Sequence, residues 1–539
     1  MTPRLPLWLV LGVPAAAALA MYWPTLRTGF LGDDFGLIRA FDGCDGAWGM
    51  AQCVGQMFIS GVGPPSNQYR PLTMATFALN AAASMDPFGW HLVNVVLHAA
   101  NAALVALFAW QLQDGDTTRA RAAALMAGAL FAWLPFAVEP TAWVAARFDG
   151  LALLWLLVAA CAFLRSATWR DGYGWLSLGA TMLAYMSKES AAIGAPLILA
   201  LAWHRQRAGS GLLRSVVGAL RTALPWLLIA AAYFVFRRII FGDPFRFFPG
   251  ASPFTALITG EWLASVPVML QWATFALPET GPRTVFVVSA MVLAVCALAA
   301  GVAERAKGRA LVAMAFAMVA ALALLLSQWR WSFTGEGGRV LAAIGAIAVV
   351  AASLPLAASG RPRALAWVAA CVLLGSQFVL TQAAVARWAR AGEDTPALAR
   401  QLAELARAMP ADGYAFVVIA DHIGPVPFGR NAQIGFMLPP IQPSPITQQL
   451  IVQTDENPAP WPDLFTRDVV GRLKREPFDP RPSSSLPPKV APPHAMPDRW
   501  LCWSPRTRTL QPLDLALAPD LANWGAAWKQ GLADSGCSG

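Results

Sequence analysis

The residues best suited to chemistry near the start of the chain are two adjacent carboxylates, Asp33 and Asp34. They follow an apolar stretch long enough to cross a bilayer, and ionisable groups at membrane depth are costly to desolvate and often functional. A carboxylate there could act as a general base, taking the proton from an acceptor hydroxyl as its oxygen attacks a sugar carbon. The alternative is a solvated loop or a helix N-cap.

A second group of candidates consists of four basic residues. They are Arg70 in Tyr69-Arg70-Pro71-Leu72-Thr73, Arg147, Lys188 in Ser187-Lys188-Glu189, and Arg339 after Gly338. Guanidinium and ammonium groups bind phosphate oxygens, so these side chains could hold an anionic leaving group. The alternative is a set of local ion pairs. Arg147 would then pair with Asp149 or Glu139, and Lys188 with Glu189.

A third group lies on one predicted helix. His91, Asn94 and His98 stand at positions i, i+3 and i+7, so they share one helix face. Polar groups within a membrane span must be paired, which favours hydrogen bonds between helices or a role in a substrate site. A metal site is a further alternative, although two histidines seven positions apart lack the i, i+4 spacing that chelates well.

The composition indicates which elements position these residues. Of 539 residues, 57% are hydrophobic and 13% are charged, compared with roughly 25% charged in soluble domains. A disordered, collagen-like or disulfide-scaffold chain is excluded, and the length exceeds the ~250–300 residues at which single soluble cores stop growing. The net charge of +9 does not indicate nucleic-acid binding, because most of the arginine lies in short loops between apolar segments.

The composition therefore predicts an all-α polytopic membrane protein. Apolar stretches that could span a bilayer occur at 7–24, 91–110, 122–138, 149–165, 173–187, 190–204, 222–240, 284–303, 310–327, 339–357 and 364–384. The stretches at 173–187 and 190–204 are short and form a tight pair around Lys188. A further stretch, 256–277, carries Glu261, and we expect it to be re-entrant or interfacial.

The loop charges predict the orientation. Arg and Lys are denser in the loops that are cytoplasmic when the N-terminus is cytoplasmic, so the C-terminal region is expected outside. Arg147, Lys188 and Arg339 then lie on the outer side with the acidic pair. Outer cations oppose the positive-inside rule, which favours a role in anion binding. We expect an uncleaved first helix; a cleaved signal peptide is the alternative and leaves the orientation unchanged.

Four cysteines provide an independent check on this orientation. Cys44, Cys53, Cys502 and Cys537 all fall on the predicted outer side, where disulfides persist, and their even number favours pairs over free thiols. The remaining cysteines, Cys161, Cys296 and Cys371, lie inside predicted spans and are expected to be apolar fillers.

The C-terminal region differs in composition from the spans. Residues 392–410 predict an amphipathic helix and 414–420 a buried strand, whereas the prolines of 439–497 predict a long irregular linker. We expect two domains: a transmembrane domain over 1–390, with an outer loop at 25–90, and a small extracytoplasmic α/β domain over 391–539.

Six motifs occur in an order that resembles the GT-C superfamily of integral-membrane glycosyltransferases, in particular the branch of the O-mannosyltransferases and the dolichyl-phosphate-mannose–protein mannosyltransferase-like proteins. They are Asp33-Asp34, Tyr69 to Thr73, His91 to His98, Pro135 to Glu139 with Trp143, Arg147 with Asp149, and Ser187-Lys188-Glu189. The resemblance implies a sugar donor carried on a polyprenyl phosphate, an acidic catalytic loop after the first helix, and no nucleotide-sugar fold. The chain departs from the family at Leu134 and at Gly338-Arg339.

These observations together predict an inverting glycosyltransferase of a bacterial-type inner membrane, with its active site facing the periplasm. Asp33 or Asp34 would be the base, and the four cations would hold the leaving phosphate. His91, Asn94, His98, Glu139, Asp149 and Glu189 would support them. The acceptor, a protein Ser/Thr or a cell-envelope glycan, and the use of a divalent metal stay open. The alternatives are a flippase for lipid-linked sugars and a non-catalytic envelope scaffold.

Overall fold

The computed structural model describes residues 5–60, 68–113, 115–206, 211–242, 253–267, 269–270, 280–328, 338–360, 362–410, 413–430, 433–455, 497–513 and 531–537. The chain divides into two compact units. Unit 1 contains residues 1–23, 46–82 and 90–385, and unit 2 contains residues 24–45, 83–89 and 386–539. The outer loop expected at 25–90 is therefore divided between the two units. Its acidic pair, Asp33 and Asp34, belongs to unit 2 with the C-terminal region.

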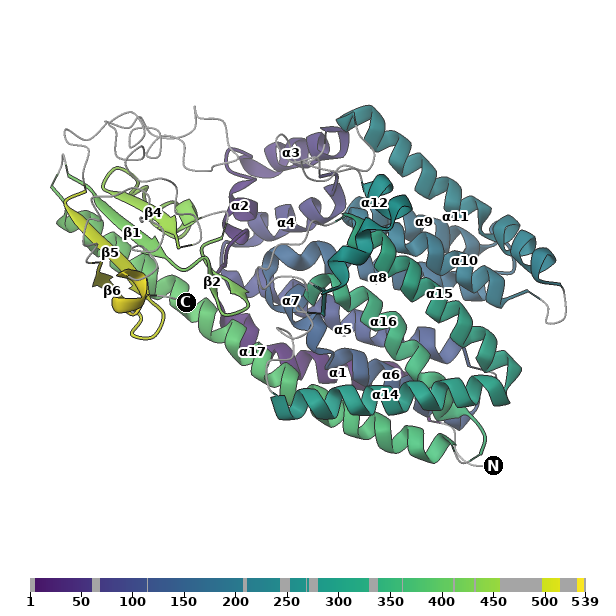
Figure 1. The fold of residues 1–539 in the computed structure, drawn as a ribbon. Coiled ribbons are helices and arrows are strands. Elements are labelled where there is room, and N and C mark those ends of the chain that lie inside the picture. The colour runs from purple at the N-terminus through teal and green to yellow at the C-terminus, as the bar shows by residue number, and fades with distance from the viewer. Residues whose placement is uncertain are drawn as a thin grey trace. The chain divides into compact units, whose positions relative to one another are not determined.

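Unit 1 is built of helices (Figure 1). They are α1 (Leu7–Tyr22), α3 (Gly46–Ser60), α4 (Pro71–Ala83), α5 (Pro87–Gln111), α6 (Thr118–Ala132), α7 (Val138–Ala142), α8 (Arg147–Arg165), α9 (Gly172–Ser187), α10 (Gly194–His204), α11 (Leu212–Phe241), α12 (Pro253–Thr259), α14 (Thr280–Ala303), α15 (Arg305–Gln328), α16 (Gly338–Ser353) and the first part of α17 (Pro362–Ala408). Short 3-10 helices flank several of them: η2 (Pro135–Ala137), η3 (Val144–Ala146), η4 (Glu189–Ile193), η5 (Glu261–Ser265) and η6 (Leu354–Ala357).

The predicted membrane architecture is confirmed. Each of the eleven predicted spans coincides with a helix or with a helix and its adjoining 3-10 turn. Among the described residues, eight helices are long and apolar enough to cross a membrane, and the pair α6 and α7, bent by 53°, brings the number to nine. Helices α9 and α10 have only 16 and 11 residues. The stretch expected to be re-entrant begins with α12 and η5, and residues 271–279 lie outside the described part.

Close helix packing in unit 1 depends on small residues. A Cβ added at Gly128 of α6 would lie 2.7 Å from Cγ of Pro14 in α1 and 2.9 Å from Cβ of Ala106 in α5. A Cβ at Gly345 of α16 would lie 2.5 Å from a methyl carbon of Leu134. Membrane helices approach closely where such residues meet, because lipid gives no hydrophobic drive for their association.

Unit 2 combines helices with a sheet (Figure 1). Its elements are η1 (Trp23–Arg27), α2 (Asp34–Arg39), the end of α17, β1 (Ala415–Ile419), β2 (His422–Ile423), β3 (Val426–Pro427), η7 (Gln433–Met437), β4 (Leu450–Thr454), β5 (Arg499–Ser504) and β6 (Thr509–Pro512). The main sheet has the order β4-β1-β5-β6. Strand β1 is parallel to β4 and β5, with Val417 opposite both Val452 and Leu501, and β6 is antiparallel to β5.

For the C-terminal region, one expectation is confirmed and one needs correction. The helix expected at 392–410 is present, and it is the end of α17, which runs without a break from the last span over 47 residues in all. A helix of that length is ~70 Å long, more than twice the ~30 Å hydrocarbon core. The proline-rich stretch from 439 is not wholly a linker, because it contains β4; residues 456–496, with most of its prolines, lie outside the described part. The strand expected at 414–420 is β1.

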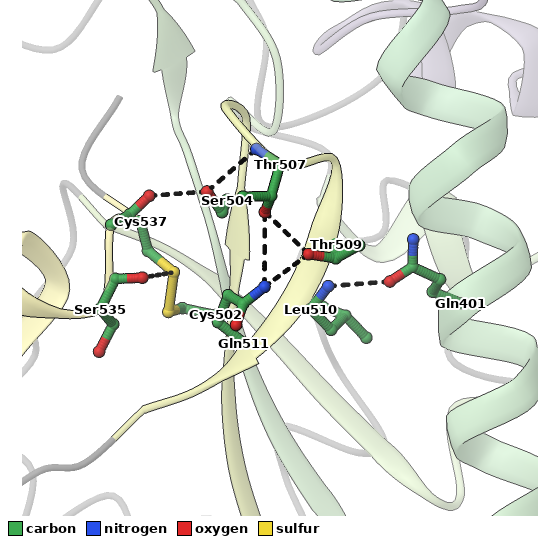
Figure 2. The surroundings of a disulfide bond; sticks show 10 residues. Gln401, Cys502, Ser504, Thr507, Thr509, Leu510, Gln511, Ser535 and Cys537 are labelled. Carbon is green, nitrogen blue, oxygen red and sulfur yellow. Dashed lines mark hydrogen bonds between the residues drawn. A yellow bond between two sulfur atoms is a disulfide. The ribbon is translucent and has the colours of Figure 1, made fainter.

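Disulfides are found where the cysteine count predicted them. Cys502 of β5 is bonded to Cys537, with 5.9 Å between their Cα atoms (Figure 2). Cys44 and Cys53 are also disulfide-bonded. At the edge strand β6, the Leu510 amide donates to Oε1 of Gln401 in α17 at 2.8 Å (Figure 2). The disulfide therefore attaches the C-terminal segment to a sheet that is itself joined to α17.

Candidate active site

The acidic pair of unit 2 forms the start of a short helix. Asp33 is half-buried and occupies the N-cap position of α2, whereas Asp34 is fully buried in its first turn. Oδ2 of Asp34 accepts a hydrogen bond from the Leu31 amide at 3.0 Å. The N-cap alternative therefore describes the position of Asp33, and Asp34 closes the turn that precedes the helix.

The acidic turn is held by the C-terminal part of the same unit. Gly32 has φ +48, a left-handed conformation that favours glycine, and its amide donates to the Phe428 carbonyl at 2.9 Å. The Phe35 ring packs against Phe436 at 4.7 Å between centroids. On the other side of the turn, the Thr395 hydroxyl of α17 donates to the carbonyl of Phe30 at 2.9 Å. Chain segments nearly 400 residues apart thus position this turn.

The cations expected to bind phosphate all lie inside unit 1. Their carboxylate partners differ from the local ion pairs considered from the sequence. Lys188 pairs with Asp149 of α8, with Nζ 2.6 Å from both carboxylate oxygens, rather than with its neighbour Glu189. Glu189 instead accepts two hydrogen bonds from Arg70, one of them from Nε at 2.9 Å. Arg70 also lies 4.7 Å above the Phe148 ring.

Arg339 completes this arrangement of ion pairs. Its guanidinium lies 3.3 Å from a carboxylate oxygen of Glu139, and its backbone amide donates to the other oxygen at 3.1 Å. The guanidinium also stacks 4.9 Å from the Trp143 ring. All these charged side chains are largely buried, between 5% and 12% exposed. We call the residues Arg70, Glu139, Asp149, Lys188, Glu189 and Arg339 the ion-pair cluster.

Burial and mutual attraction shift the pKa values within the ion-pair cluster. Burial disfavours ionisation of Glu189, but the charge and hydrogen bonds of Arg70 outweigh it and lower the pKa of Glu189 to about 2. Burial lowers the pKa of Lys188, an effect that Asp149 opposes and that the charges of Arg70 and Arg339 reinforce. The charges of the cluster are thus close enough to influence one another, as at sites that bind or react with charged ligands.

Arg147 is placed differently from the other three cations. It is fully buried, and its guanidinium donates to Oδ1 of Asn94 and the Trp90 carbonyl, each at 2.8 Å, and to Thr76 of α4 at 3.3 Å. It also lies 4.4 Å above the Phe77 ring. These contacts join the start of α8 to α4 and α5. The guanidinium is thus bonded to groups of the protein itself, in contrast to a cation that is available to a ligand.

The polar side chains on one face of α5 make hydrogen bonds to neighbouring segments, and two of them line a small cavity. Nδ2 of Asn94 donates to the Trp143 carbonyl at 2.8 Å, and Nε2 of His98 lies 3.1 Å from the Ala132 carbonyl. His91 is fully buried on the same helix. Asn94 and His98 line a cavity of about 30 Å³ together with Asp149 and Arg339 of the ion-pair cluster, a space about the size of one water molecule.

The structure adds residues that the sequence reasoning missed. Arg237 of α11 is fully buried, its charge helps to lower the pKa of Glu189, and it lies 5.1 Å from the Phe241 ring. Thr73 of α4 donates to the Ser187 carbonyl at 3.0 Å, next to Lys188. The signal for Arg237 was an arginine pair, Arg237-Arg238, at the end of an apolar span. Within the described residues, no group of three or more His, Cys, Asp or Glu side chains is arranged to hold a metal.

Comparison with known proteins gives relatives of the kind that the sequence motifs indicate. No family model matches the chain. Protein O-mannosyl-transferase Tmtc2 of Drosophila melanogaster is 34% identical over 199 residues, which is 34% of this chain and 20% of that protein. Tmtc1 of the same organism is 34% identical over 188 residues, 33% of this chain and 21% of that protein. Human TMTC2 is 37% identical over 123 residues, 22% of this chain and 14% of that protein.

The predicted resemblance to the O-mannosyltransferase branch is confirmed. The aligned part spans only about a fifth of the length of these O-mannosyltransferases. Among solved structures, ArnT from Cupriavidus metallidurans bound to undecaprenyl phosphate aligns over 77% of this chain and 83% of its own, with 12% identity and a TM-score of 0.38. That score does not establish a shared fold, whereas the similarity to the O-mannosyltransferases is one of sequence.

Proposed function

We propose that the protein is an integral-membrane glycosyltransferase that transfers a sugar from a polyprenyl-phosphate donor to an extracytoplasmic hydroxyl, with inversion at the sugar carbon. The observation that carries the proposal is the buried ion-pair cluster, in a chain similar to protein O-mannosyltransferases. Preorganised cations stabilise charge that develops on a leaving phosphate, and they do so best where water is excluded. The relatives favour a protein hydroxyl as acceptor; a cell-envelope glycan is the other class.

The proposed base is Asp33. Its neighbour Asp34 is buried and accepts a hydrogen bond from the Leu31 amide, which suits a structural role, whereas Asp33 is half-buried. The acceptor oxygen would form a bond to the sugar C1 as the bond from C1 to the phosphate oxygen breaks. The bonding electron pair leaves with the polyprenyl phosphate, and the acceptor proton passes to the carboxylate.

Three of the four predicted cations keep their proposed role toward the donor phosphate: Arg70, Lys188 and Arg339. Their carboxylate partners keep them charged and oriented despite burial. Arg147 is proposed instead as a positioning residue, because its guanidinium is already bonded to Asn94 and to the Trp90 carbonyl. Its effect on donor binding would then pass through the packing of α4, α5 and α8.

The proposed location is a bacterial-type inner membrane, with the acidic turn and unit 2 on the periplasmic side. The loop charges support this orientation. The disulfide between Cys502 and Cys537 also supports an oxidising compartment for unit 2. Reporter fusions after Gly209 and after Gly392 should give opposite signals if this topology is correct.

The test of the proposed function is transfer by the purified full chain in liposomes that contain a polyprenyl-phosphate mannose and a Ser/Thr peptide. Formation of a mannosylated peptide, detected by mass spectrometry, would support the proposal. Movement of the lipid-linked sugar across the bilayer without transfer would identify a flippase instead. Neither activity with any polyprenyl-phosphate sugar would favour a non-catalytic scaffold.

A further inference from the structure

Unit 2 contains an open groove beside the acidic turn. Its volume is about 670 Å³, within the ~300–1,000 Å³ typical of ligand sites. Four chain segments of the same unit form its walls: the end of η1 with residues 28–30, the turn before α5, the 395–403 part of α17, and the loop at 440–443. Apolar and proline side chains predominate, among them Leu26, Phe30, Phe88, Pro396, Ile441 and Pro443.

The groove carries an uncompensated positive charge. Arg27 and Arg400 both line it and are exposed, and within the residues that the structure describes neither side chain makes a hydrogen bond or an ion pair. Among the described residues that line the groove, one is acidic: Asp86, whose Oδ1 accepts a hydrogen bond from the Phe88 amide at 3.0 Å. The two arginines therefore contrast with Arg70, Lys188 and Arg339, which are held by carboxylates, and with Arg147, which is held by protein hydrogen bonds.

The groove is continuous with the turn that presents the proposed base. Gly29 and Phe30 line it, and Asp33 lies three residues after Phe30. Thr395 lines the groove as well, and its hydroxyl holds the Phe30 carbonyl at 2.9 Å. A molecule seated in the groove would thus contact the backbone that leads directly into the acidic turn.

We propose that this groove binds the acceptor polypeptide, as an extended segment with acidic residues beside the hydroxyl that is modified. The proposal rests on the proposed function and names the acceptor site and its charge preference. Apolar and proline walls suit the side chains of an extended segment, and the two arginines provide charge complementarity to aspartate or glutamate. A bound donor phosphate is the rival occupant, but unit 1 already contains a buried set of cations suited to it.

The test is a binding measurement that requires no transfer. The full chain is placed in nanodiscs, and fluorescence anisotropy measures the binding of labelled Thr/Pro peptides that differ only in carrying aspartates or lysines beside each Thr. The variants are Arg27→Ala with Arg400→Ala, the charge-reversed Arg27→Glu with Arg400→Glu, and a matched control, Arg499→Ala with Arg506→Ala, which removes two exposed arginines of unit 2 outside the groove. Thermal unfolding confirms that each variant is folded.

We expect the aspartate peptide to bind more tightly than the lysine peptide. The Arg27/Arg400 alanine variant should weaken that binding about fivefold or more, because two exposed ion pairs are lost, and the control should not. The glutamate variant should reverse the peptide preference. Unchanged peptide binding in both groove variants, or loss of polyprenyl-phosphate binding in place of peptide binding, would overturn the proposal. Arginine-dependent peptide binding without any transfer would leave the groove assigned and refute the proposed function alone.

Discussion

Nζ of Lys188 lies 2.6 Å from both carboxylate oxygens of Asp149, a residue 39 positions earlier in the chain. The pair joins the first turn of α8 to the break between α9 and η4. Because both side chains are largely buried, each neutralises a charge that the interior would otherwise disfavour. This pair, rather than the one between adjacent Lys188 and Glu189, sets the geometry around the proposed phosphate site.

Removal of one member of this pair should be more damaging than removal of both. Lys188→Met or Asp149→Leu alone leaves an uncompensated buried charge, which typically costs about 3–5 kcal/mol, whereas the double variant leaves none. Thermal unfolding in detergent of the two single variants and the double variant provides a double-mutant cycle. Additive losses would show that the two side chains do not interact energetically.

The pair of Arg70 and Glu189 should make stability depend on pH. The pKa of Glu189 falls from 4.5 to about 2 in the folded chain, so its contribution is complete above pH 4.5 and is lost as the pH falls toward 2. The stability difference between wild type and Glu189→Gln should therefore shrink over that interval. The matched control is Glu404→Gln, at an exposed carboxylate of α17. A difference that does not change with pH would contradict the pairing.

Replacement of the proposed base should affect turnover more than binding. Asp33→Asn keeps the size of the side chain but cannot accept the proton, and loss of a general base typically lowers the rate by ~10²–10⁴-fold. Donor-lipid binding should be nearly unchanged. Asp45→Asn, at an exposed carboxylate in the same unit, is the control. Near-normal turnover of folded Asp33→Asn would assign the base to Asp34 instead. Near-normal turnover of both Asp33→Asn and Asp34→Asn would exclude this mechanism.

Arg147 and Arg339 should respond differently to substitution. Arg147→Met leaves the buried Oδ1 of Asn94 without this donor, and a buried unsatisfied acceptor costs about 1–3 kcal/mol; it also removes the hydrogen bond to the Trp90 carbonyl. Its main effect should be a lower melting temperature. Arg339→Met should mainly raise the KM for the donor lipid, because that cation is proposed to contact the phosphate. Equal effects of both variants on donor KM, at unchanged stability, would return Arg147 to the phosphate site.

The disulfide of the C-terminal segment should stabilise unit 2. Cys502→Ser with Cys537→Ser removes a cross-link between residues 35 positions apart. It should lower the free energy of unfolding by about 2–4 kcal/mol. Reducing agent should destabilise the wild type more than the variant, in which only the disulfide bonding of Cys44 and Cys53 is left to be reduced. Non-reducing peptide mapping should recover a peptide linking residues 502 and 537, and we expect a second one linking residues 44 and 53. Free alkylation of all four thiols in unreduced protein would disagree with both expectations.

The sequence by itself determined the features that depend on neighbouring residues. Runs of apolar residues define spans because every backbone polar group in lipid must be satisfied within a helix, so all eleven stretches are helical. The strand at 414–420 was predictable from its own short run of apolar residues after a turn, and the five residues of β1 are all buried. The order of six motifs, from Asp33-Asp34 to Ser187-Lys188-Glu189, carried the resemblance to the O-mannosyltransferases.

Only the tertiary structure decided which distant residues meet. Arg70 and Glu189 are 119 positions apart, and Arg339 binds Glu139 across 200 positions; helix packing brings them together, so no local spacing encodes their pairing. The sequence favoured Arg147 as a phosphate ligand, but α4 and α5 provide its partners. The sequence likewise could not show that Phe428 and Thr395 hold the acidic turn, because that contact exists only once the C-terminal part has folded against residues 29–35 within unit 2.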